Sequence, residues 1–141
     1  MLQIYSPRVA EYSSIIPFAA SPISAGFPSP AADYLEEGID LNKEMVKNPD
    51  STFVAKVVGV SMIDAGFYPG DIIVVDRSLN VANNNIAVCY IDGEFTLKRI
   101  KIEHDRVFLQ PENRNYSPIF ITPENDFVVW GVVTYLIKKI R

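Results

Sequence analysis

Short runs of β-branched and aromatic residues follow one another along the chain from Ser51 onward, and Gly, Pro, Asn and Asp separate them. Runs of about four to eight such residues between turn-forming residues are typical of β-strands. We find no strand-helix-strand alternation and no internal repeat, which favours an antiparallel sheet. The pattern therefore predicts a mainly β domain with strands over residues 52–58, 71–76, 85–91, 94–102, 106–110 and 127–137.

Two short polar segments predict turns that join these strands. Asp92-Gly93 separates two apolar runs, and this dipeptide favours the type I′ turn of a tight hairpin, in which both central residues have positive φ. Pro69-Gly70, between Tyr68 and Asp71, predicts a second turn.

The first fifty residues have a different composition. Residues 1–30 contain five prolines among serines and alanines, which forbids a continuous helix and predicts an extended arm. Residues 31–48 alone have a helix-like composition, with Asp40 as a candidate N-cap and Asn48-Pro49 as a stop signal. We expect one or two short helices in this segment, packed on the sheet.

Charge and hydropathy exclude several classes of protein. The 141 residues carry a formal net charge of -4, so the chain lacks the basic field of proteins that bind nucleic acid directly. A small basic cluster, Lys138, Lys139 and Arg141, is interpreted as a solvated strand end. No apolar run approaches the roughly 18 to 20 residues that span a bilayer, so we expect no membrane anchor and a cytoplasmic protein. The single cysteine, Cys89, is expected to be a buried thiol.

Ser61 is a candidate nucleophile. It follows the strand predicted over residues 52–58, and Gly59 permits an unusual backbone path just before it. At the start of a turn or short helix, free backbone N–H groups would form an oxyanion hole. The alternative interpretation is that Ser61 only caps this turn.

Lys98 is a candidate general base, a role that requires a neutral amine and hence burial away from water and carboxylates. Strand alternation places Thr96, Lys98, Ile100 and Ile102 on one face, so Lys98 would lie beside two isoleucines on a core face, with Arg99 and Lys101 outward. The alternative is a lysine that protects an edge strand from aggregation.

The sequence does not support a catalytic triad, a zinc site or a phosphate-binding loop. The only histidine, His104, lies in a polar run that predicts a solvated hairpin turn, which argues against a Ser-His-carboxylate triad and a zinc site. No glycine-rich phosphate-binding loop is present. We therefore expect neither a metal nor a cofactor.

Several ordered motifs resemble the UmuD family of SOS mutagenesis proteins, which is related to the self-cleaving domains of LexA and of phage repressors. The resemblance covers nearly the whole chain after residue 25. It implies a small twisted antiparallel β domain of the LexA/UmuD C-terminal type, with one or two short helices and an extended N-terminal arm. The matching segments are residues 26–34 (GFPSPAADY), 39–42 (IDLN), 59–64 (GVSMID), 70–71 (GD) and 92–98 (DGEFTLK).

The resemblance also implies roles for individual residues. Ser61 would be the nucleophile, Lys98 the general base, and the bond between Ala25 and Gly26 the self-cleavage site. The backbone N–H groups of Ser61 and Met62 would stabilise the oxyanion. Val60 departs from the family, in which the residue before the nucleophile is often acidic or otherwise polar.

The family further implies partners and a domain organisation. Cleavage would be stimulated by a RecA filament on single-stranded DNA. The released fragment would form a homodimer and join a UmuC-like subunit in an error-prone translesion DNA polymerase, within SOS-response DNA repair. Residues 1–25 would be a removable arm, 26–50 a linker with a short helix, and 51–141 the peptidase and dimerisation domain.

Three alternative functions compete with this interpretation. A self-cleaving repressor would need roughly 50 to 60 residues of DNA-reading domain before the cut, more than the 25 present. A Ser-Lys signal peptidase would need a membrane anchor. A catalytically silent β domain that acts only as a polymerase accessory stays open, because binding would persist if Ser61 and Lys98 were misaligned.

Overall fold

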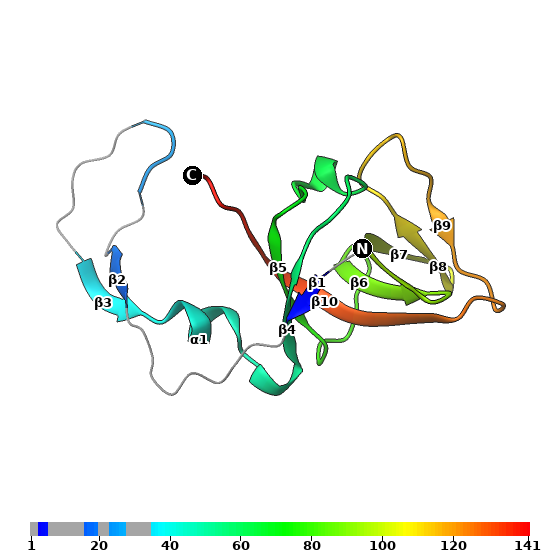
Figure 1. Cartoon of the computed structure of the whole chain (residues 1–141), viewed down its shortest axis with the longest axis horizontal. Coiled ribbons are helices and arrows are strands. Elements are labelled where there is room, and N and C mark those ends of the chain that lie inside the picture. Colours follow the sequence, from blue (N-terminus) through cyan, green and yellow to red (C-terminus); the bar gives the residue numbers. More distant parts are fainter. Residues whose placement is uncertain (1–2, 6–15, 20–22, 28–34) are drawn as a thin grey trace. The chain divides into compact units, whose positions relative to one another are not determined.

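The computed structural model describes residues 3–5, 16–19, 23–27 and 35–141 (Figure 1). The chain forms two compact units. The larger unit comprises Met1–Arg8 and Asn48–Arg141, and the smaller unit comprises Val9–Lys47. This division does not test the domain boundaries predicted after residues 25 and 50, which stay predictions.

The larger unit is built on one antiparallel sheet. Its strand order is β1-β4-β5-β10-β6-β7-β8-β9 within the described residues. Every strand pair in the described part of this sheet is antiparallel, which confirms the predicted mainly β fold class. The strands are β1 (Gln3–Tyr5), β4 (Thr52–Lys56), β5 (Ile72–Asp76), β6 (Ile86–Ile91), β7 (Glu94–Glu103), β8 (Arg106–Gln110), β9 (Ile119–Phe120) and β10 (Phe127–Ile137).

The six predicted strands are confirmed, with small differences at their ends. The largest difference is at β4, which ends at Lys56 instead of residue 58. The chain leaves the strand there because Gly59 has a φ of 84°, a left-handed conformation that favours glycine. This early exit directs residues 57–62 away from the strand and creates the loop that carries Ser61.

The predicted turns are also confirmed. Asp92 and Gly93 have φ values of 48° and 89°, as a type I′ turn requires, and they join β6 to β7. Gly70 has a φ of 91° in the turn that the backbone bond from Asp71 N–H to Tyr68 O closes at 3.1 Å. His104 is exposed at the turn between β7 and β8, as expected for a solvated hairpin.

The sheet buries side chains on both faces. Val88 of β6 belongs to one core cluster, whereas its neighbours Ala87 and Cys89 belong to another, because successive strand residues point to opposite faces. Cys89 is fully buried, as predicted. The first cluster consists of Ala55, Val57, Met62, Phe67, Ile73, Val75, Val88 and Leu97, and the second of Ala87, Cys89, Ile100 and Leu109.

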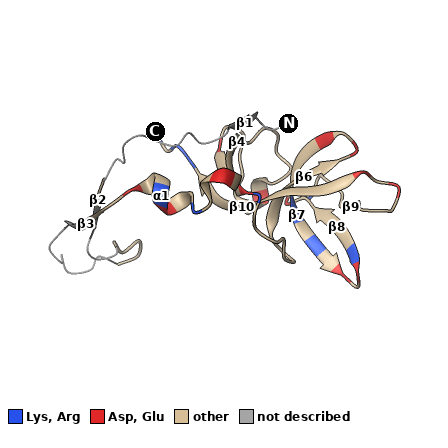
Figure 2. Ribbon diagram, turned by 90° about the horizontal axis from the view of Figure 1, so that it is seen from below, with Lys and Arg blue, Asp and Glu red and all other residues tan. Residues whose placement is uncertain are grey.

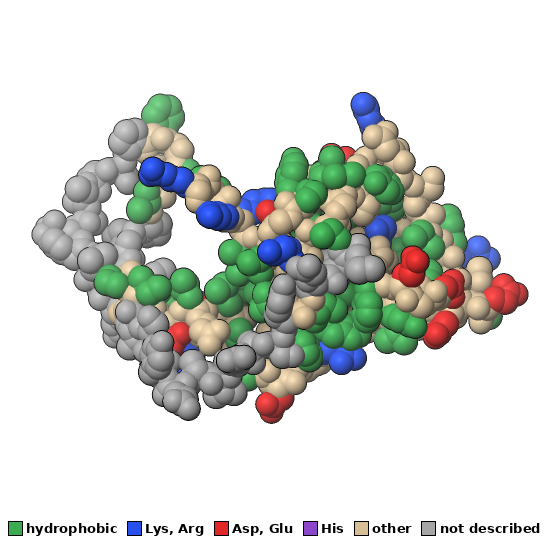
Figure 3. Space-filling model, viewed as in Figure 1, with side chains coloured by type: hydrophobic (Ala, Val, Ile, Leu, Met, Phe, Trp, Pro, Cys, Tyr) green, Lys and Arg blue, Asp and Glu red, His purple; other side chains and the backbone are tan. Residues whose placement is uncertain are grey.

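Hydrophobic side chains also reach the surface of this unit (Figure 3). Val128 of β10 is 51% exposed and Phe95 of β7 is 38% exposed. Acidic residues lie at several of the turns, and basic residues lie among them (Figure 2). No helix of the described residues is both long enough and apolar enough to cross a membrane.

The smaller unit contains a two-stranded sheet and one helix. Strand β2 (Ile16–Ala19) pairs antiparallel with β3 (Leu35–Ile39), and helix α1 spans Leu41–Met45. Asp40 caps this helix as predicted, because its Oδ1 accepts hydrogen bonds from the backbone N–H groups of Asn42 and Lys43. A 3-10 turn, Pro49–Ser51, follows in the larger unit.

The expected short helix in residues 31–48 is confirmed by α1, but the composition of this segment did not predict the neighbouring strand. Residues 35–39 form β3. The physical reason is the partner strand: pairing with β2 satisfies the backbone groups of β3, and local propensity is weak enough for such pairing to override it. Within the predicted extended arm, the described parts include β1 and β2, and the remaining arm residues lie outside the described residues.

Candidate active site

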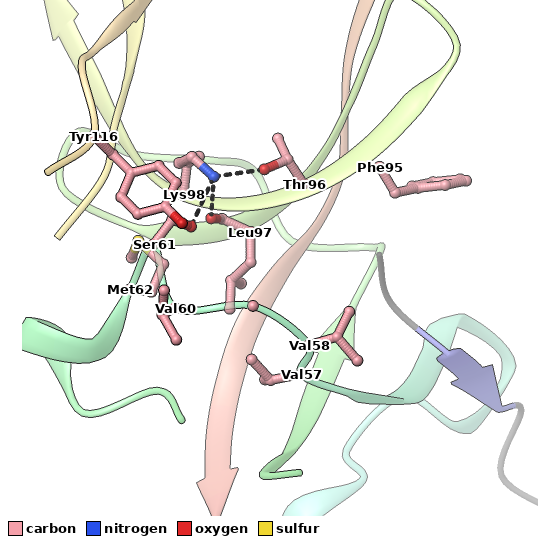
Figure 4. A pocket seen from close by; sticks show the side chains of 11 residues that line it. Val57, Val58, Val60, Ser61, Met62, Phe95, Thr96, Leu97, Lys98 and Tyr116 are labelled. Atoms are coloured by element: carbon pink, nitrogen blue, oxygen red, sulfur yellow. Dashed lines mark hydrogen bonds between the residues drawn. The ribbon is translucent and has the colours of Figure 1, made fainter. Parts of the chain in front are cut away.

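The structure brings Ser61 and Lys98 together, although 37 positions separate them in the sequence. Lys98 lies in the middle of β7, and Ser61 lies in the loop between β4 and a 3-10 turn, Ile63–Ala65. The Lys98 Nζ atom is 3.0 Å from Ser61 Oγ, within hydrogen-bonding distance (Figure 4). The two residues that sequence reasoning singled out are therefore direct neighbours.

Lys98 is buried, with an exposed fraction of 7%. Its Nζ also contacts Thr96 Oγ1 at 2.6 Å and the backbone carbonyl oxygen of Leu97 at 3.1 Å. All three partners are uncharged, and no ion pair within the described residues involves this amine. Burial lowers the pKa of Lys98, opposed by a smaller interaction with Cys89 that raises it. The site therefore favours the neutral amine, the form that accepts a proton.

The position of β7 explains this burial. β7 pairs with β6 on one side and β8 on the other, so Lys98 is not an edge-strand lysine. Ala87 and Cys89 of β6 lie opposite Lys98 and Thr96, and both are fully buried. Their small, uncharged side chains shield the amine from water without supplying a counterion.

The predicted face pattern of β7 is only partly right. Ile100 is buried at 1%, but Ile102 is 37% exposed and does not belong to either core cluster. Leu97, expected on the opposite face, is also buried at 6%. The reason is that the core covers both faces at the middle of this ten-residue strand and neither face at its end.

Ser61 is not a simple turn cap. Met62 occupies the cap position of the 3-10 turn, where no side-chain capping bond forms, and the hydroxyl of Ser61 is paired with Lys98 instead. No hydrogen bond within the described part of the chain uses the backbone N–H of Ser61 or of Met62. These two N–H groups are the ones proposed from sequence as oxyanion donors.

Two residues that the sequence did not point to, Asn113 and Glu112, form hydrogen bonds with the loop that carries Ser61. Asn113, only 8% exposed, donates from Nδ2 to the carbonyl oxygen of Val60 at 2.8 Å. The backbone N–H of Asp64 donates to the carbonyl oxygen of Glu112 at 2.8 Å. Asn113 lies 53 positions from Val60 in a polar stretch without periodicity, so no local signal identifies it.

A cavity of about 200 Å³ lies in front of Ser61 and Lys98. The Ser61 loop forms one wall, and the first half of β7 forms the other. Exposed side chains, Val58, Val60, Phe95 and Tyr116, give the mouth an apolar rim. A cavity of this size and lining suits an extended peptide with small side chains.

The predicted cleavage bond, between Ala25 and Gly26, belongs to the smaller unit, whereas Ser61 and Lys98 belong to the larger one. Residues 23–27 are exposed, with Ile23 at 88% and Phe27 at 91%. The Ser24 hydroxyl donates to the carbonyl oxygen of Phe27 at 2.5 Å. The bond thus lies in an exposed bend, and the two residues that it joins are small.

The other sequence-based candidates take no part in this arrangement. His104 lies at the exposed turn after β7 and contributes nothing to the cavity. In the described parts of the chain, no group of three or more His, Cys, Asp or Glu residues is arranged to hold a metal ion.

A serine hydroxyl beside a buried lysine that forms no ion pair within the described residues is the arrangement of Ser-Lys hydrolases, one of the known variants of the serine triad. The profile of the Peptidase S24-like family matches residues 17–134. The chain belongs to this family, which confirms the resemblance stated from the sequence motifs.

Individual relatives agree with this assignment. Protein MucA of Salmonella typhimurium is 42% identical over 135 residues, which cover 95% of this chain and 92% of MucA. Protein SamA of Salmonella typhimurium is 38% identical over 141 residues, covering 100% of this chain and 98% of SamA. LexA repressor 1 of Geobacter sulfurreducens is 38% identical over 123 residues, or 86% of this chain and 60% of the repressor.

Burial of the Lys98 amine is predicted to lower the free energy of unfolding, whether or not the protein is an active peptidase. A lysine whose pKa is lowered in the folded state binds fewer protons there than in the unfolded state, so stability rises with pH between the lowered and the ordinary value. We expect Lys98→Met to raise the free energy of unfolding at neutral pH by about 0.5–2 kcal/mol. Urea denaturation measures this difference.

The pH dependence provides the control for this prediction. The gain in Lys98→Met should be constant below the lowered pKa of Lys98 and shrink as pH rises toward the ordinary lysine value. Burial raises the pKa of Cys89 to about 12, but this group is present in both proteins and its contribution largely cancels. A gain that does not shrink at alkaline pH would show that the amine is not the source.

Proposed function

We propose that this protein cleaves its own chain between Ala25 and Gly26, with Ser61 as nucleophile and Lys98 as general base. The observation that carries the proposal is the 3.0 Å contact between Lys98 Nζ and Ser61 Oγ at a buried amine that pairs with no carboxylate of the described residues. Membership of the Peptidase S24-like family supports a peptidase activity.

The proposed reaction has two steps. The Ser61 hydroxyl transfers its proton to neutral Lys98 as its oxygen attacks the carbonyl carbon of Ala25. Lys98 then gives the proton to the nitrogen of Gly26 as the peptide bond breaks, leaving an ester between Ser61 and Ala25. Water hydrolyses this ester, with Lys98 again taking and returning a proton. The N–H groups of Ser61 and Met62 stabilise the negative oxygen in both steps.

The biological setting of the proposal follows the family resemblance. A RecA filament on single-stranded DNA stimulates the cleavage, and fragment 26–141 serves as an accessory subunit of a UmuC-type translesion polymerase. The exposed Val128 and Phe95 supply apolar surface for a homodimer or for the polymerase subunit. The acidic net charge supports an action through protein partners and not through direct contact with DNA.

Intact-mass measurement tests the reaction directly. Protein incubated with RecA, single-stranded DNA and a nucleotide analogue is expected to yield residues 1–25 and 26–141. Ser61→Ala and Lys98→Ala should each reduce the rate by at least about a thousandfold, because nucleophile and base act as one unit. Cleavage at an undiminished rate in Ser61→Ala would exclude the assigned nucleophile. Absence of cleavage in the natural chain, with binding to the polymerase subunit retained, would favour the silent accessory protein.

The rate of spontaneous cleavage should depend on pH through Lys98. Only the neutral amine accepts the proton of Ser61, so the rate should rise with pH and level off above the pKa of Lys98. Because burial lowers this pKa, the plateau should begin below the ordinary lysine value. Single-turnover rates from neutral to alkaline pH measure the profile. A flat profile, with the fold intact by circular dichroism, would contradict a lysine base.

Asn113 should act as a positioning residue for the nucleophile. Asn113→Asp keeps the oxygen that accepts from Asn115 N–H but removes the donor to Val60. The Ser61 loop then lacks the hydrogen bond that fixes the position of Val60. We expect the plateau cleavage rate to fall about ten- to a hundredfold, since small misplacements are costly. The carboxylate that this substitution introduces can only raise the apparent pKa of the profile, so the plateau rate above that pKa reports the loss of the donor.

A control variant is available in the loop between β9 and β10. Asn125 also accepts a backbone N–H, from Thr122, and donates from Nδ2, to Asp92 Oδ2 at 2.7 Å. Asn125→Asp removes a side-chain donor at a residue that neither lines the cavity nor bonds the Ser61 loop, and should leave the cleavage rate within about twofold. Equal losses of cleavage rate in both variants would show that Asn113 contributes only to the stability of the fold.

A further inference from the structure

The segment that follows β8 binds the Ser61 loop on both sides of the nucleophile. Asn113 donates from its side chain to the carbonyl oxygen of Val60, the residue before Ser61. The carbonyl oxygen of Glu112 accepts the backbone N–H of Asp64 at 2.8 Å. Two adjacent residues therefore hold the loop at positions 60 and 64, with the nucleophile between them.

Glu112 also contacts the strand that carries the base. Its carboxylate accepts a hydrogen bond from Nε of Arg99 at 2.6 Å, and the two groups form an ion pair. Arg99 directly follows Lys98 in β7. Glu112 thus joins both halves of the dyad, since its backbone contacts the Ser61 loop and its side chain contacts the strand of Lys98.

The guanidinium of Arg99 is fixed relative to β7. Its Nη1 donates to the carbonyl oxygen of Asn84 at 2.7 Å. Asn84 is itself bound to the strand, because its backbone N–H donates to the carbonyl oxygen of Ile100 at 2.8 Å. The side chains of Arg99 and Glu112 are only 27% and 29% exposed, so salt and water screen this pair less than a fully exposed one.

The ion pair lies on the face of β7 opposite the amine. Successive residues of a strand point to opposite faces, so the side chains of Lys98 and Arg99 point apart. The residues that line the cavity in the described part of the chain include neither Arg99 nor Glu112. The hydrogen bonds of Lys98 Nζ also go to other residues. The pair can therefore act on cleavage through the positions of Ser61 and Lys98, without touching the reacting atoms.

We propose, on the basis of the self-cleavage proposed above, that the ion pair of Arg99 and Glu112 is a clamp that positions Ser61 relative to Lys98. Ser61 lies in a loop, and loops are more mobile than the strands they connect. Proton transfer needs the hydroxyl and the amine in contact, and a misplacement of about 1 Å costs about a hundredfold in rate. Arg99 and Glu112 are thus positioning residues for the dyad.

Hydrogen exchange followed by mass spectrometry tests the clamp without using the activity. All chains in this experiment carry Ser61→Ala, so that they stay intact. Adding Arg99→Ala should speed amide exchange in residues 62–66 at least about tenfold, because Glu112 no longer holds Asp64 firmly. The hydrogen bonds of Arg99 go to Glu112 and Asn84, so this effect must pass through Glu112. Unchanged exchange in 62–66 would overturn the proposal.

Glu44→Ala is the control for loss of an ion pair. It removes the pair between Glu44 and Lys47 in the smaller unit, whose side chains are 53% and 63% exposed. Exchange in 62–66 and the cleavage rate should both stay within about twofold, because exposed pairs contribute little. Equal acceleration of exchange in Glu44→Ala and Arg99→Ala would overturn the clamp, since the effect would then not be specific to its ion pair.

Cleavage rates test the effect on the dyad in chains that keep Ser61. Rates are compared on the alkaline plateau, where Lys98 is neutral in every variant. Arg99→Ala and Glu112→Ala should each lower the plateau rate about tenfold, and the double variant also about tenfold, because the clamp is lost only once. Independent losses would multiply to about a hundredfold in the double variant and would overturn the proposal.

A charge swap separates positioning from a general loss of stability. Arg99→Glu and Glu112→Arg each place like charges together, whereas the double variant restores an ion pair in reverse. The swapped protein should cleave at least about tenfold faster than either single variant, with all three folded by circular dichroism. A swapped protein no faster than the single variants would contradict the clamp.

Failure of the clamp and failure of the proposed function give different results. If the natural chain does not cleave itself, exchange in 62–66 still reports whether the ion pair holds the Ser61 loop. If the chain cleaves itself equally fast with and without the pair, the dyad of Ser61 and Lys98 stands and the clamp is overturned.

Discussion

The contact between the amine of Lys98 and the hydroxyl of Ser61 is the interaction on which the chemistry of this fold depends. A lysine is useful as a base only where water and carboxylates are kept away from it. Here an interior strand carries the amine, and the fully buried Ala87 and Cys89 lie across from its segment. Burial also raises the pKa of Cys89 to about 12, and the interaction of this nearby group with Lys98 raises the pKa of the amine by less than burial lowers it.

Two carboxylates of the larger unit are engaged with other partners. Glu112 pairs with Arg99, the residue after Lys98, at 2.6 Å on the other face of β7. Burial opposes the ionisation of Asp76, but hydrogen bonds from Ser78, Asn48 and Ser51 outweigh it and lower the pKa of this carboxyl. Neither carboxylate forms an ion pair with Lys98.

The sequence predicted local features well and tertiary features incompletely. Strand runs, the Asp92-Gly93 turn and the Asp40 cap depend on neighbouring residues, and the structure confirms all of them. The proximity of Ser61 and Lys98 was accessible only through family motifs, since no local pattern joins positions 37 apart. The bond from Asn113 to Val60 and the pairing of β1 with β4 link distant segments, and neither leaves a periodic signal. β3 shows the same limit, because its partner strand decided its conformation.

The core cluster under β1 connects the arm to the Ser61 loop. Ile4 packs against the cluster that contains Met62, the residue after Ser61, and Leu97, the residue before Lys98. β1 and the chain neighbours of the two reactive residues therefore pack into the same group of side chains. Close-packed protein interiors transmit displacements. A displacement within this cluster would therefore reach both members of the dyad, because Met62 is bonded to Ser61 and Leu97 to Lys98 in the chain.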